Sequence, residues 1–480
     1  MSKYAAALDF GSSKVALAVG EQTPGGVRIV SYHDAPAAGI ECGEIVNDFK
    51  VKEIVASLLR QAEEDILEPI STISVGLSGR VLHSKDLPCQ ITRTDSKAYI
   101  TKEEVRQITR TRYKASLEND ETVFEAVPQK YSTEDRIGIT QDELIGMVGS
   151  QIDADFKIFY GRKSILSRRI TVLEECGITL GKAILAPIAS ARAVLTKPEM
   201  ENGVALVDIG KNTTEVAIIK DNIVRQAAII PFGGESVTTD IKTVTNITRE
   251  WAETIKLLHG RCCEEYAVEN KKLVLKNESE SSDGEVEVSL LVRTVEARLS
   301  EIFDAVRYVI EQSGYAAKIT SGVVITGGAS HHEDLIQLAG ALLGQKIRLA
   351  APASIDKDSV DDAFDVYAST VVGLVQETLD PMLSHAIEYK ADEPAAAPST
   401  ANTSLFNEAD EPEEDRLSAR EERERRREEE RKAKEIQKQQ ETLRKQQEAQ
   451  RKAEEKARKK AEKENQPSFF DMFFSKDDKA

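Results

Sequence analysis

Two short segments of the chain combine an aspartate, a glycine and small hydroxyl residues between apolar runs. The first reads Asp9-Phe10-Gly11-Ser12-Ser13-Lys14, and the second reads Asp208-Ile209-Gly210-Lys211-Asn212-Thr213-Thr214. A glycine in a tight hairpin lets backbone N–H groups approach an anion closely, and the hydroxyls add donors. An aspartate at a strand end can orient a hydrated Mg²⁺. One such turn is usually an ordinary turn, but two in matching contexts predict a nucleotide phosphate site between two related subdomains.

Buried strands must hold both turns. The apolar patterning predicts an antiparallel meander over residues 4–9, 14–20 and 27–35, and a second meander from 204 through 223–231. The remaining predicted strands cover 73–77, 121–128, 152–160, 182–185, 272–276, 286–292 and 322–326. The predicted helices cover 51–67, 101–118, 164–176, 188–195, 236–245, 248–258, 295–313, 333–342 and 363–374, with Thr101 and Glu104 as a capping box.

The length, charge and cysteine content of the chain limit the classes of function that it can have. A chain of 480 residues with 40% hydrophobic content has room for two or three domains. The net charge of −18 argues against a nucleic-acid partner. The five cysteines form no CxxC pair, so we expect free thiols in a reducing compartment. We expect neither a signal peptide nor a transmembrane helix, because no apolar run reaches roughly 18–20 residues.

The last ninety residues differ from the rest of the chain. Residues 391–412 have the composition of a flexible linker. Residues 413–464 are almost entirely strong helix formers with many acid–base pairs, which favours a lone solvated helix over a coiled coil. Fully helical, it would span about 75–80 Å. The segment 465–480 carries a cluster of apolar side chains that would insert into a membrane interface or a partner groove, or else dock on the body: Phe469, Phe470, Met472, Phe473 and Phe474.

With the adenosine-type turn Thr326-Gly327-Gly328-Ala329, the two phosphate-type turns resemble the superfamily of actin, heat-shock ATPases and sugar kinases. Over about residues 1–375 the chain is most similar to the FtsA family of bacterial cell-division proteins. Specific stretches are 127–131, 145–147, 232–241, 252–256 and 324–330. The resemblance implies an α/β actin-like fold with two RNase-H-like subdomains, an inserted small α/β subdomain and a charged helical tail.

The implied organisation has seven parts. Subdomain 1A covers 1–80 and 163–203, the inserted subdomain 1C covers 81–162, subdomain 2A covers 204–241 and 319–390, and 2B covers 242–318. A linker (391–412), the charged helix (413–464) and a membrane-targeting peptide (465–480) follow.

The resemblance also assigns ATP and Mg²⁺ to particular positions. Asp9 and Asp208 would hold Mg²⁺ through water, and Asp208 would also face the attacking water. The nucleotide would lie against Gly11, Ser12, Ser13, Lys14, Gly210, Lys211, Asn212, Thr213, Thr214, Gly233, Gly234, Glu253, Lys256, Gly327, Gly328, Ala329 and Ser330. Ordinary alternatives are a solvated Lys14, an exposed Glu253–Lys256 pair, and a simple strand-to-helix turn at Gly327.

Two departures from the family pattern predict slow or negligible hydrolysis. The second loop lacks two glycines that the family usually has, and Lys211 would compensate with charge. The connecting segment at 186–190 carries no Gln or Glu to position water. Because phosphoryl transfer depends on positioning and charge stabilisation, this loss should slow turnover without abolishing binding.

The leading functional interpretation is a membrane adaptor for cell division. Such proteins polymerise head to tail, bind the C-terminal peptide of the tubulin-like FtsZ at the cytoplasmic face of the inner membrane, and recruit later division proteins to the septum. Arg293 and Arg298 are the candidate FtsZ contacts in subdomain 2B, although surface arginines are more often merely solvated. The alternatives are a small-molecule kinase of the same superfamily, a heat-shock-type chaperone and a relative that assembles pili.

Overall fold

The computed structural model describes residues 3–389, apart from 119, 264, 266–270 and 277–281. These residues belong to one unit, Met1–Ala395. The predicted linker, charged helix and membrane-targeting peptide therefore lie outside the described residues. Within the described ranges, no helix is both long enough and apolar enough to cross a membrane.

The first sheet contains five strands in the order β11-β6-β1-β2-β3. The meander β1 (Tyr4–Phe10), β2 (Lys14–Thr23) and β3 (Gly26–Pro36) is antiparallel, as predicted. Strands β6 (Thr72–Leu77) and β11 (Thr179–Leu185) extend it in parallel from β1. The phosphate-type turn at Gly11 joins β1 to β2.

The second sheet repeats this topology. Its order is β14-β13-β12-β17-β18. Strands β12 (Val204–Ile209), β13 (Thr214–Lys220) and β14 (Ile223–Ile230) form the antiparallel meander, and β17 (Val323–Thr326) and β18 (Ile347–Leu349) add in parallel. The internal repeat read from the sequence is confirmed at the level of strand order. The fold is the predicted actin-like α/β arrangement.

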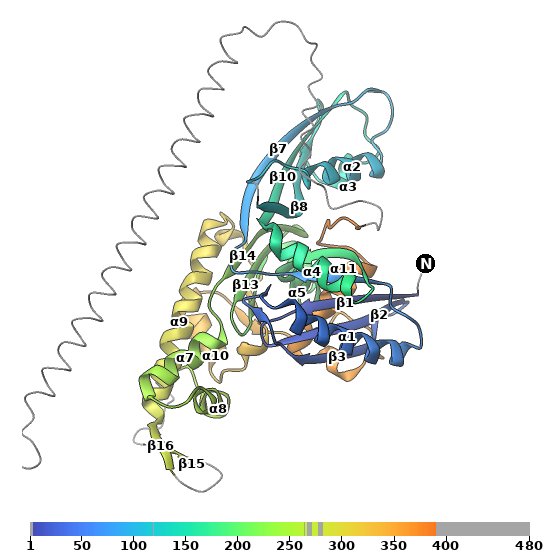
Figure 1. Cartoon of the computed structure of the whole chain (residues 1–480). Coiled ribbons are helices and arrows are strands. Elements are labelled where there is room, and N and C mark those ends of the chain that lie inside the picture. Colours follow the sequence, from blue (N-terminus) through green and yellow to red (C-terminus); the bar gives the residue numbers. More distant parts are fainter. Residues whose placement is uncertain (1–2, 119, 264, 266–270, 277–281, 390–480) are drawn as a thin grey trace, which may run out of the picture. The chain divides into compact units, whose positions relative to one another are not determined.

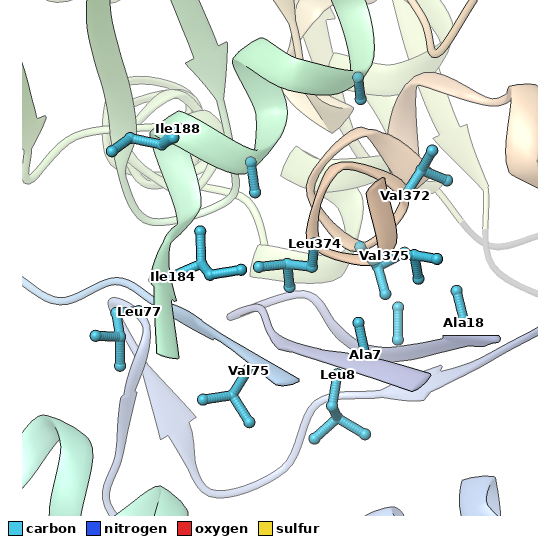
Figure 2. Close-up of a cluster of buried hydrophobic side chains, with 14 of the residues drawn as sticks. Ala7, Leu8, Ala18, Val75, Leu77, Ile184, Ile188, Val372, Leu374 and Val375 are labelled. Atoms are coloured by element: carbon cyan, nitrogen blue, oxygen red, sulfur yellow. The ribbon is translucent and has the colours of Figure 1, made fainter. Parts of the chain in front are cut away.

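Two helices cover one face of the first sheet. Helices α5 (Ala186–Val194) and α11 (Ser369–Leu379) pack against each other, and α11 also packs on β1 and β2. Figure 2 shows Leu374 and Val375 lying over the strands that carry Ala7 and Ala18. A Cβ atom on Gly373 would lie only 1.7 Å from the Ala189 carbonyl oxygen, so the two helices could not approach this closely with any larger residue. Helix α5 also contacts β12 and β13, and therefore links both sheets.

The inserted segment forms its own sheet, ordered β7-β10-β8-β9 (Figure 1). Its strands are β7 (His83–Thr92), β8 (Glu121–Ser132), β9 (Ile137–Ile139) and β10 (Gln151–Arg162), with helices α2 (Lys102–Arg112) and α3 (Gln141–Leu144). We call these elements the insert. A separate cluster of buried residues, including Phe156 and Ile158, forms its core. The subdomain boundaries assigned from the sequence stay predictions.

The remaining elements surround the two main sheets. Helices α1 (Asp48–Ile66) and α4 (Lys163–Glu175) pack on the first sheet, and α6 (Lys197–Asn202) precedes β12. Helices α7 (Gly234–Thr245), α8 (Arg249–His259), α9 (Val288–Gln312) and α10 (Leu335–Leu343) belong to the second half. Two small hairpins, β4 (Ile40–Glu41) with β5 (Glu44–Ile45) and β15 (Lys272–Lys276) with β16 (Ser282–Glu287), complete the elements.

Four local predictions were wrong in detail. The helix expected over 101–118 ends at Arg112, since Tyr113 turns toward buried partners. The capping box is only half formed, because the Glu104 carboxylate binds Arg93 instead. The strand expected over 286–292 ends at Glu287, where α9 begins. The helix expected over 363–374 is divided into two 3₁₀ turns, Asp361–Phe364 and Val366–Ala368, before α11 starts at Ser369.

Candidate functional site

A cavity of about 730 Å³ lies where the two phosphate-type turns meet. Both turns contribute lining residues, and so do the Gly327 turn, α8 and the start of α5. Sixteen positions predicted from the sequence line it: Asp9, Gly11, Ser12, Ser13, Lys14, Asp208, Gly210, Lys211, Asn212, Thr213, Gly234, Glu253, Lys256, Gly327, Gly328 and Ala329. The fold thus brings together residues that are up to about three hundred positions apart in the sequence.

The first turn is fixed by neighbouring loops. The Ser12 hydroxyl accepts a hydrogen bond from the Gly43 backbone N–H at 3.0 Å. The Ser13 carbonyl accepts one from the Ala37 N–H at 2.9 Å. Lys14 lines the cavity and is partly exposed, but it is not a free lysine, because its ammonium binds the Asp34 carboxylate at 2.6 Å and the Tyr32 hydroxyl. An anion in the cavity would have to compete with Asp34 for this lysine.

Backbone hydrogen bonds join the second turn to the loop before α7. Gly210 donates its N–H to Thr213 and accepts from the N–H of Gly234 at 3.0 Å. Glu235 donates its N–H to the Lys211 carbonyl at 2.7 Å. Lys211 itself is exposed at the cavity wall, where its charge is available to an anion. The two loops therefore form one polar surface.

Three predicted residues support this wall without lining the cavity. Thr214 is fully buried and donates its hydroxyl to the Phe232 carbonyl at 2.8 Å. Gly233 is the N-cap residue of α7 and packs against Gly210. Ser330 donates its hydroxyl to the Gly327 carbonyl at 2.7 Å. Their contacts hold the turns in place.

Carboxyl groups gather at the closed end of the cavity. Asp9, Asp208 and Glu215 all line it. Burial raises the pKa of Asp9 to about 6, and burial also raises the pKa of Asp208 and of Glu215. The Ser190 hydroxyl donates to Asp208 at 2.7 Å, which opposes that rise. These acids favour a bound cation over a bare anion.

One buried arginine interacts electrostatically with two of these acids. Arg169 is fully buried and donates to the carbonyls of Ile165 at 2.6 Å and Gly43 at 2.7 Å. Burial lowers its pKa to about 10, while Asp9 and Glu215 act in the opposite direction. Throughout the described ranges, no group of three or more His, Cys, Asp or Glu side chains is arranged to hold a metal ion directly. Contact to Mg²⁺ through water at Asp9 and Asp208 stays a prediction.

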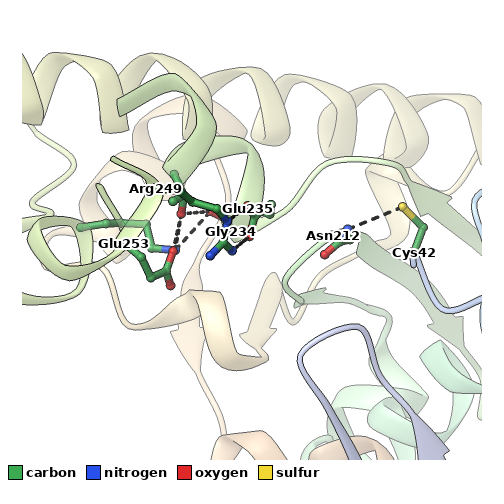
Figure 3. A network of polar contacts seen from close by, with 8 residues as sticks. Cys42, Asn212, Gly234, Glu235, Arg249 and Glu253 are labelled. Atoms are coloured by element: carbon green, nitrogen blue, oxygen red, sulfur yellow. Dashed lines mark hydrogen bonds and ion pairs between the residues drawn. The ribbon is translucent and has the colours of Figure 1, made fainter. Parts of the chain in front are cut away.

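Glu253 and Lys256 form an ion pair on α8, with 2.8 Å between the Lys256 ammonium nitrogen and a Glu253 carboxylate oxygen. The pair is not exposed, since Lys256 is only 8% accessible and also donates to the Thr238 hydroxyl at 2.9 Å. Glu235 and Arg249 form a second ion pair beside it (Figure 3). Together these groups join α7 to α8 and form the part of the cavity wall that adjoins the second phosphate-type turn.

Gly327 meets a steric demand at the adenosine-type turn. Its φ is +93°, and a Cβ atom there would lie 2.2 Å from a carboxylate oxygen of Asp208. Only glycine fits this position, because the backbone is left-handed and Asp208 lies against it. Contact between this turn and a nucleoside stays a prediction. Gly328 is covered by the Tyr367 ring, which stacks on His331 with centroids 5.3 Å apart.

Sequence reasoning missed several cavity residues. Ser78 and Glu215 meet across the cavity, and Arg169, His331 and Tyr367 contribute side chains or charge. Glu215 directly follows the predicted second turn, so its acidic side chain was a usable signal. The others have no motif that marks them.

The candidate FtsZ contacts lie outside the cavity, on α9. Arg298 is half-buried and binds Asp240 at 2.5 Å as well as Glu301. Its guanidinium also lies 5.5 Å from the centre of the Phe232 ring. Arg293 is exposed. The five apolar tail residues proposed for membrane contact lie outside the described residues.

The cavity has the features of a site for a metal-bound polyanion. Backbone N–H groups, hydroxyls and Lys211 suit phosphate, while the buried acids suit a hydrated cation. Two structurally repeated sheets with such turns facing one cavity define a protein of the actin-like class. Among solved structures, the fold is similar to the "PilM-PilN type IV pilus biogenesis complex", with a TM-score of 0.55 and 15% identity over 78% of this chain and 99% of that chain.

Sequence comparisons show which actin-like proteins the chain resembles. A family model described as "Cell division protein FtsA" matches residues 205–373. The chain is 28% identical to the cell division protein FtsA of Pseudomonas aeruginosa over 401 residues, which cover 82% of this chain and 95% of that relative. It is 27% identical to FtsA of Escherichia coli K12 over 381 residues, covering 78% and 90%. The chain is therefore similar to FtsA cell division proteins over most of its length.

Proposed function

We propose that this protein binds Mg²⁺-ATP in the cavity and links FtsZ filaments to the cytoplasmic face of the inner membrane during division. The observation that carries the proposal is the pair of phosphate-type turns, at Gly11 and Gly210, that face one cavity in a chain similar to FtsA. Gly210, Lys211 and Asn212 offer contacts to phosphate, and the acids Asp9 and Asp208 would hold the metal through water. The Gly327–Ala329 turn and the wall at Glu253 and Lys256 would contact the nucleoside.

We propose that hydrolysis is slow or negligible. Ala186 lines the cavity on the segment that enters α5, where a water-positioning side chain was expected to be missing. Glu215, a further acid that lines the cavity, already accepts a hydrogen bond from Ser78. A water molecule would therefore be poorly oriented, and phosphoryl transfer depends on that orientation. ATP would then influence the protein mainly by being bound, and hydrolysis would contribute little.

The tail supports the membrane part of the proposal. Five apolar residues lie within six positions after about fifty mostly charged ones. Acidic residues such as Asp471, Asp477 and Asp478 weaken attraction to anionic lipid, so insertion of Phe and Met side chains would carry the binding. The adaptor would associate with further copies of itself head to tail, and other division proteins would join the assembly.

The FtsZ contact is proposed for the surface of α9. A basic face beside apolar residues suits a short peptide with acidic side chains. Arg293 is the test position because its side chain is exposed on α9, whereas Arg298 is partly buried beside Asp240 and Glu301. Arg293→Glu should weaken capture of an FtsZ tail peptide at least about tenfold. Arg307→Glu, which reverses a charge 14 positions further along α9, is the control and should leave peptide binding unchanged.

The experiment that tests the adaptor role uses a supported bilayer of bacterial lipid, fluorescent FtsZ filaments and ATP. The full chain is compared with a chain truncated before Pro467. Recruitment of filaments by the full chain alone supports both the membrane peptide and the adaptor. Recruitment by both chains would place the anchor elsewhere. Recruitment by neither, with rapid ATP turnover on a small-molecule acceptor, would favour a kinase.

A further inference from the structure

The last described segment of the chain binds two buried carboxylates on different parts of the body. We call residues 382–389 the strap. The fully buried Glu377 on α11 accepts hydrogen bonds from the backbone N–H groups of Met382, Leu383 and Ser384, each at 3.0 Å. Three donors on one carboxylate fix the start of the strap against the helix that covers the first sheet.

The strap then reaches the insert. Glu125 on β8 is fully buried and accepts from the Ser384 hydroxyl at 2.7 Å and from the His385 N–H at 2.8 Å. Its third donor is the Tyr113 hydroxyl at 3.0 Å, from the residue that caps α2. Tyr113 also lies at hydrogen-bond distance, 3.0 Å, from the His385 carbonyl. One carboxylate therefore joins the strap, the sheet of the insert and its main helix.

The far end of the strap is bonded to the first sheet. The Tyr389 N–H donates to the Gly181 carbonyl on β11 at 2.9 Å. The backbones of Glu388 and Lys182 form an isolated antiparallel β-bridge. Leu383 is almost fully buried between these contacts. The strap is thus held by the body at both ends and by the insert in its middle.

These contacts make the strap and the insert depend on each other. Glu125 receives two of its three hydrogen bonds from the strap, and Glu377 receives its three backbone bonds from it. If the strap leaves, Glu125 keeps only Tyr113 among its described partners, and Glu377 keeps only Arg192. Exchanging the lost donors for water costs free energy. We propose that the strap is a latch that holds the insert on the first sheet, so that releasing the strap loosens the insert. Because residue 390 follows Tyr389 directly, the latch is the first described element that a pull on the tail would reach.

Hydrogen–deuterium exchange on the full chain tests the latch. Glu125→Leu keeps the apolar bulk of the side chain but removes every acceptor, and Ser384→Ala removes one donor in case the leucine variant fails to fold. Exchange of the α2 amides, Lys102–Arg112, should accelerate about tenfold or more in Glu125→Leu and by a smaller factor in Ser384→Ala. Glu125→Leu also removes the partner of Tyr113, which caps α2, so its α2 response alone does not separate a local effect from the latch. The deciding response is that of α2 in Ser384→Ala, which changes only hydrogen bonds made by the strap.

Two further variants separate hydrogen bonding from other effects. Glu125→Gln keeps an acceptor for His385 and Tyr113 and can donate to Ser384, so α2 should exchange as in the unmodified chain. Glu134→Leu alters an exposed carboxylate of the same insert and should also leave α2 unchanged. If Glu125→Leu or Ser384→Ala accelerates exchange only within the strap while α2 stays protected, the strap is a passive end of the chain and the proposal is overturned.

Discussion

Ser78 donates its hydroxyl to the carboxyl group of Glu215 across the cavity, joining the strand end of β6 in the first sheet to the start of β13 in the second. The two residues are 137 positions apart. Neither of the two turn motifs indicates that Ser78 and Glu215 are in contact. The contact ties together the two halves whose relative position shapes the cavity.

We expect Ser78→Ala to lower the free energy of unfolding by about 1–2 kcal/mol, because a buried acid loses its donor. Urea denaturation measures this change. Ser84→Ala is the matched control, since Ser84 donates at 3.3 Å to Gln226 in a partly buried neutral contact and should cost less. A double-mutant cycle with Glu215→Leu, which removes the acceptor, should give a coupling energy of about 1 kcal/mol, and additive effects would show that the contact contributes nothing.

The second prediction concerns the charge that replaces a family glycine. Lys211→Ala should weaken ATP binding several-fold, since the lysine acts on phosphate as a point charge at the cavity wall. The loss should shrink at high salt, where the charge is screened. Isothermal titration at two salt concentrations measures both effects. Lys357→Ala removes an exposed lysine that does not line the cavity, and equal weakening by this control would contradict a local role for Lys211.

The third prediction concerns pH. Burial raises the pKa of Glu125 to about 7 from an ordinary value of 4.5. Between these values the folded chain holds a proton that the unfolded chain has released, so the free energy of unfolding falls as pH rises. The fall attributable to Glu125 is up to about 3 kcal/mol and is complete above its folded pKa.

Glu125→Gln removes this titration while keeping most hydrogen bonds. The difference in unfolding free energy between the variant and the unmodified chain should therefore shift in favour of the variant from pH 4.5 to 7.5. Urea denaturation at several pH values measures it. Glu134→Gln is the control, because hydrogen bonds from Ser150 lower the pKa of that exposed group and no such shift is expected. A pH-independent difference for Glu125→Gln would contradict a raised pKa.

The fourth prediction concerns the charged segment 413–464, which we interpret as a spacer. If it is helical, its deletion should bring membrane-bound filaments closer to the lipid by tens of ångströms, up to about 75–80 Å. Electron cryotomography of filaments on lipid tubes measures the distance. Replacing the segment with a flexible sequence of equal residue number is the control for tail length. An unchanged distance after deletion would rule out the spacer.

The sequence by itself determined the repeated hairpins, the phosphate-type turns and the existence of a separate insert. These features depend on residues close together in the chain: alternation of apolar side chains sets a strand, and Asp-x-Gly sets the turn at its end. The turn at Gly327 was readable for the same reason, although the demand for glycine there became visible only with Asp208 beside it.

Only the tertiary structure decided how the charged groups are partnered. Lys14 binds Asp34 on β3, Lys256 is buried against Thr238, and Arg169 lies behind the acids of the cavity. The same holds for Glu125, whose donors come from the strap some 260 residues later. The cost of burying a charge depends on which distant segments exclude water from it and which of them supply a hydrogen bond. Neither is encoded in a local pattern, so these partners emerge only when the chain is folded.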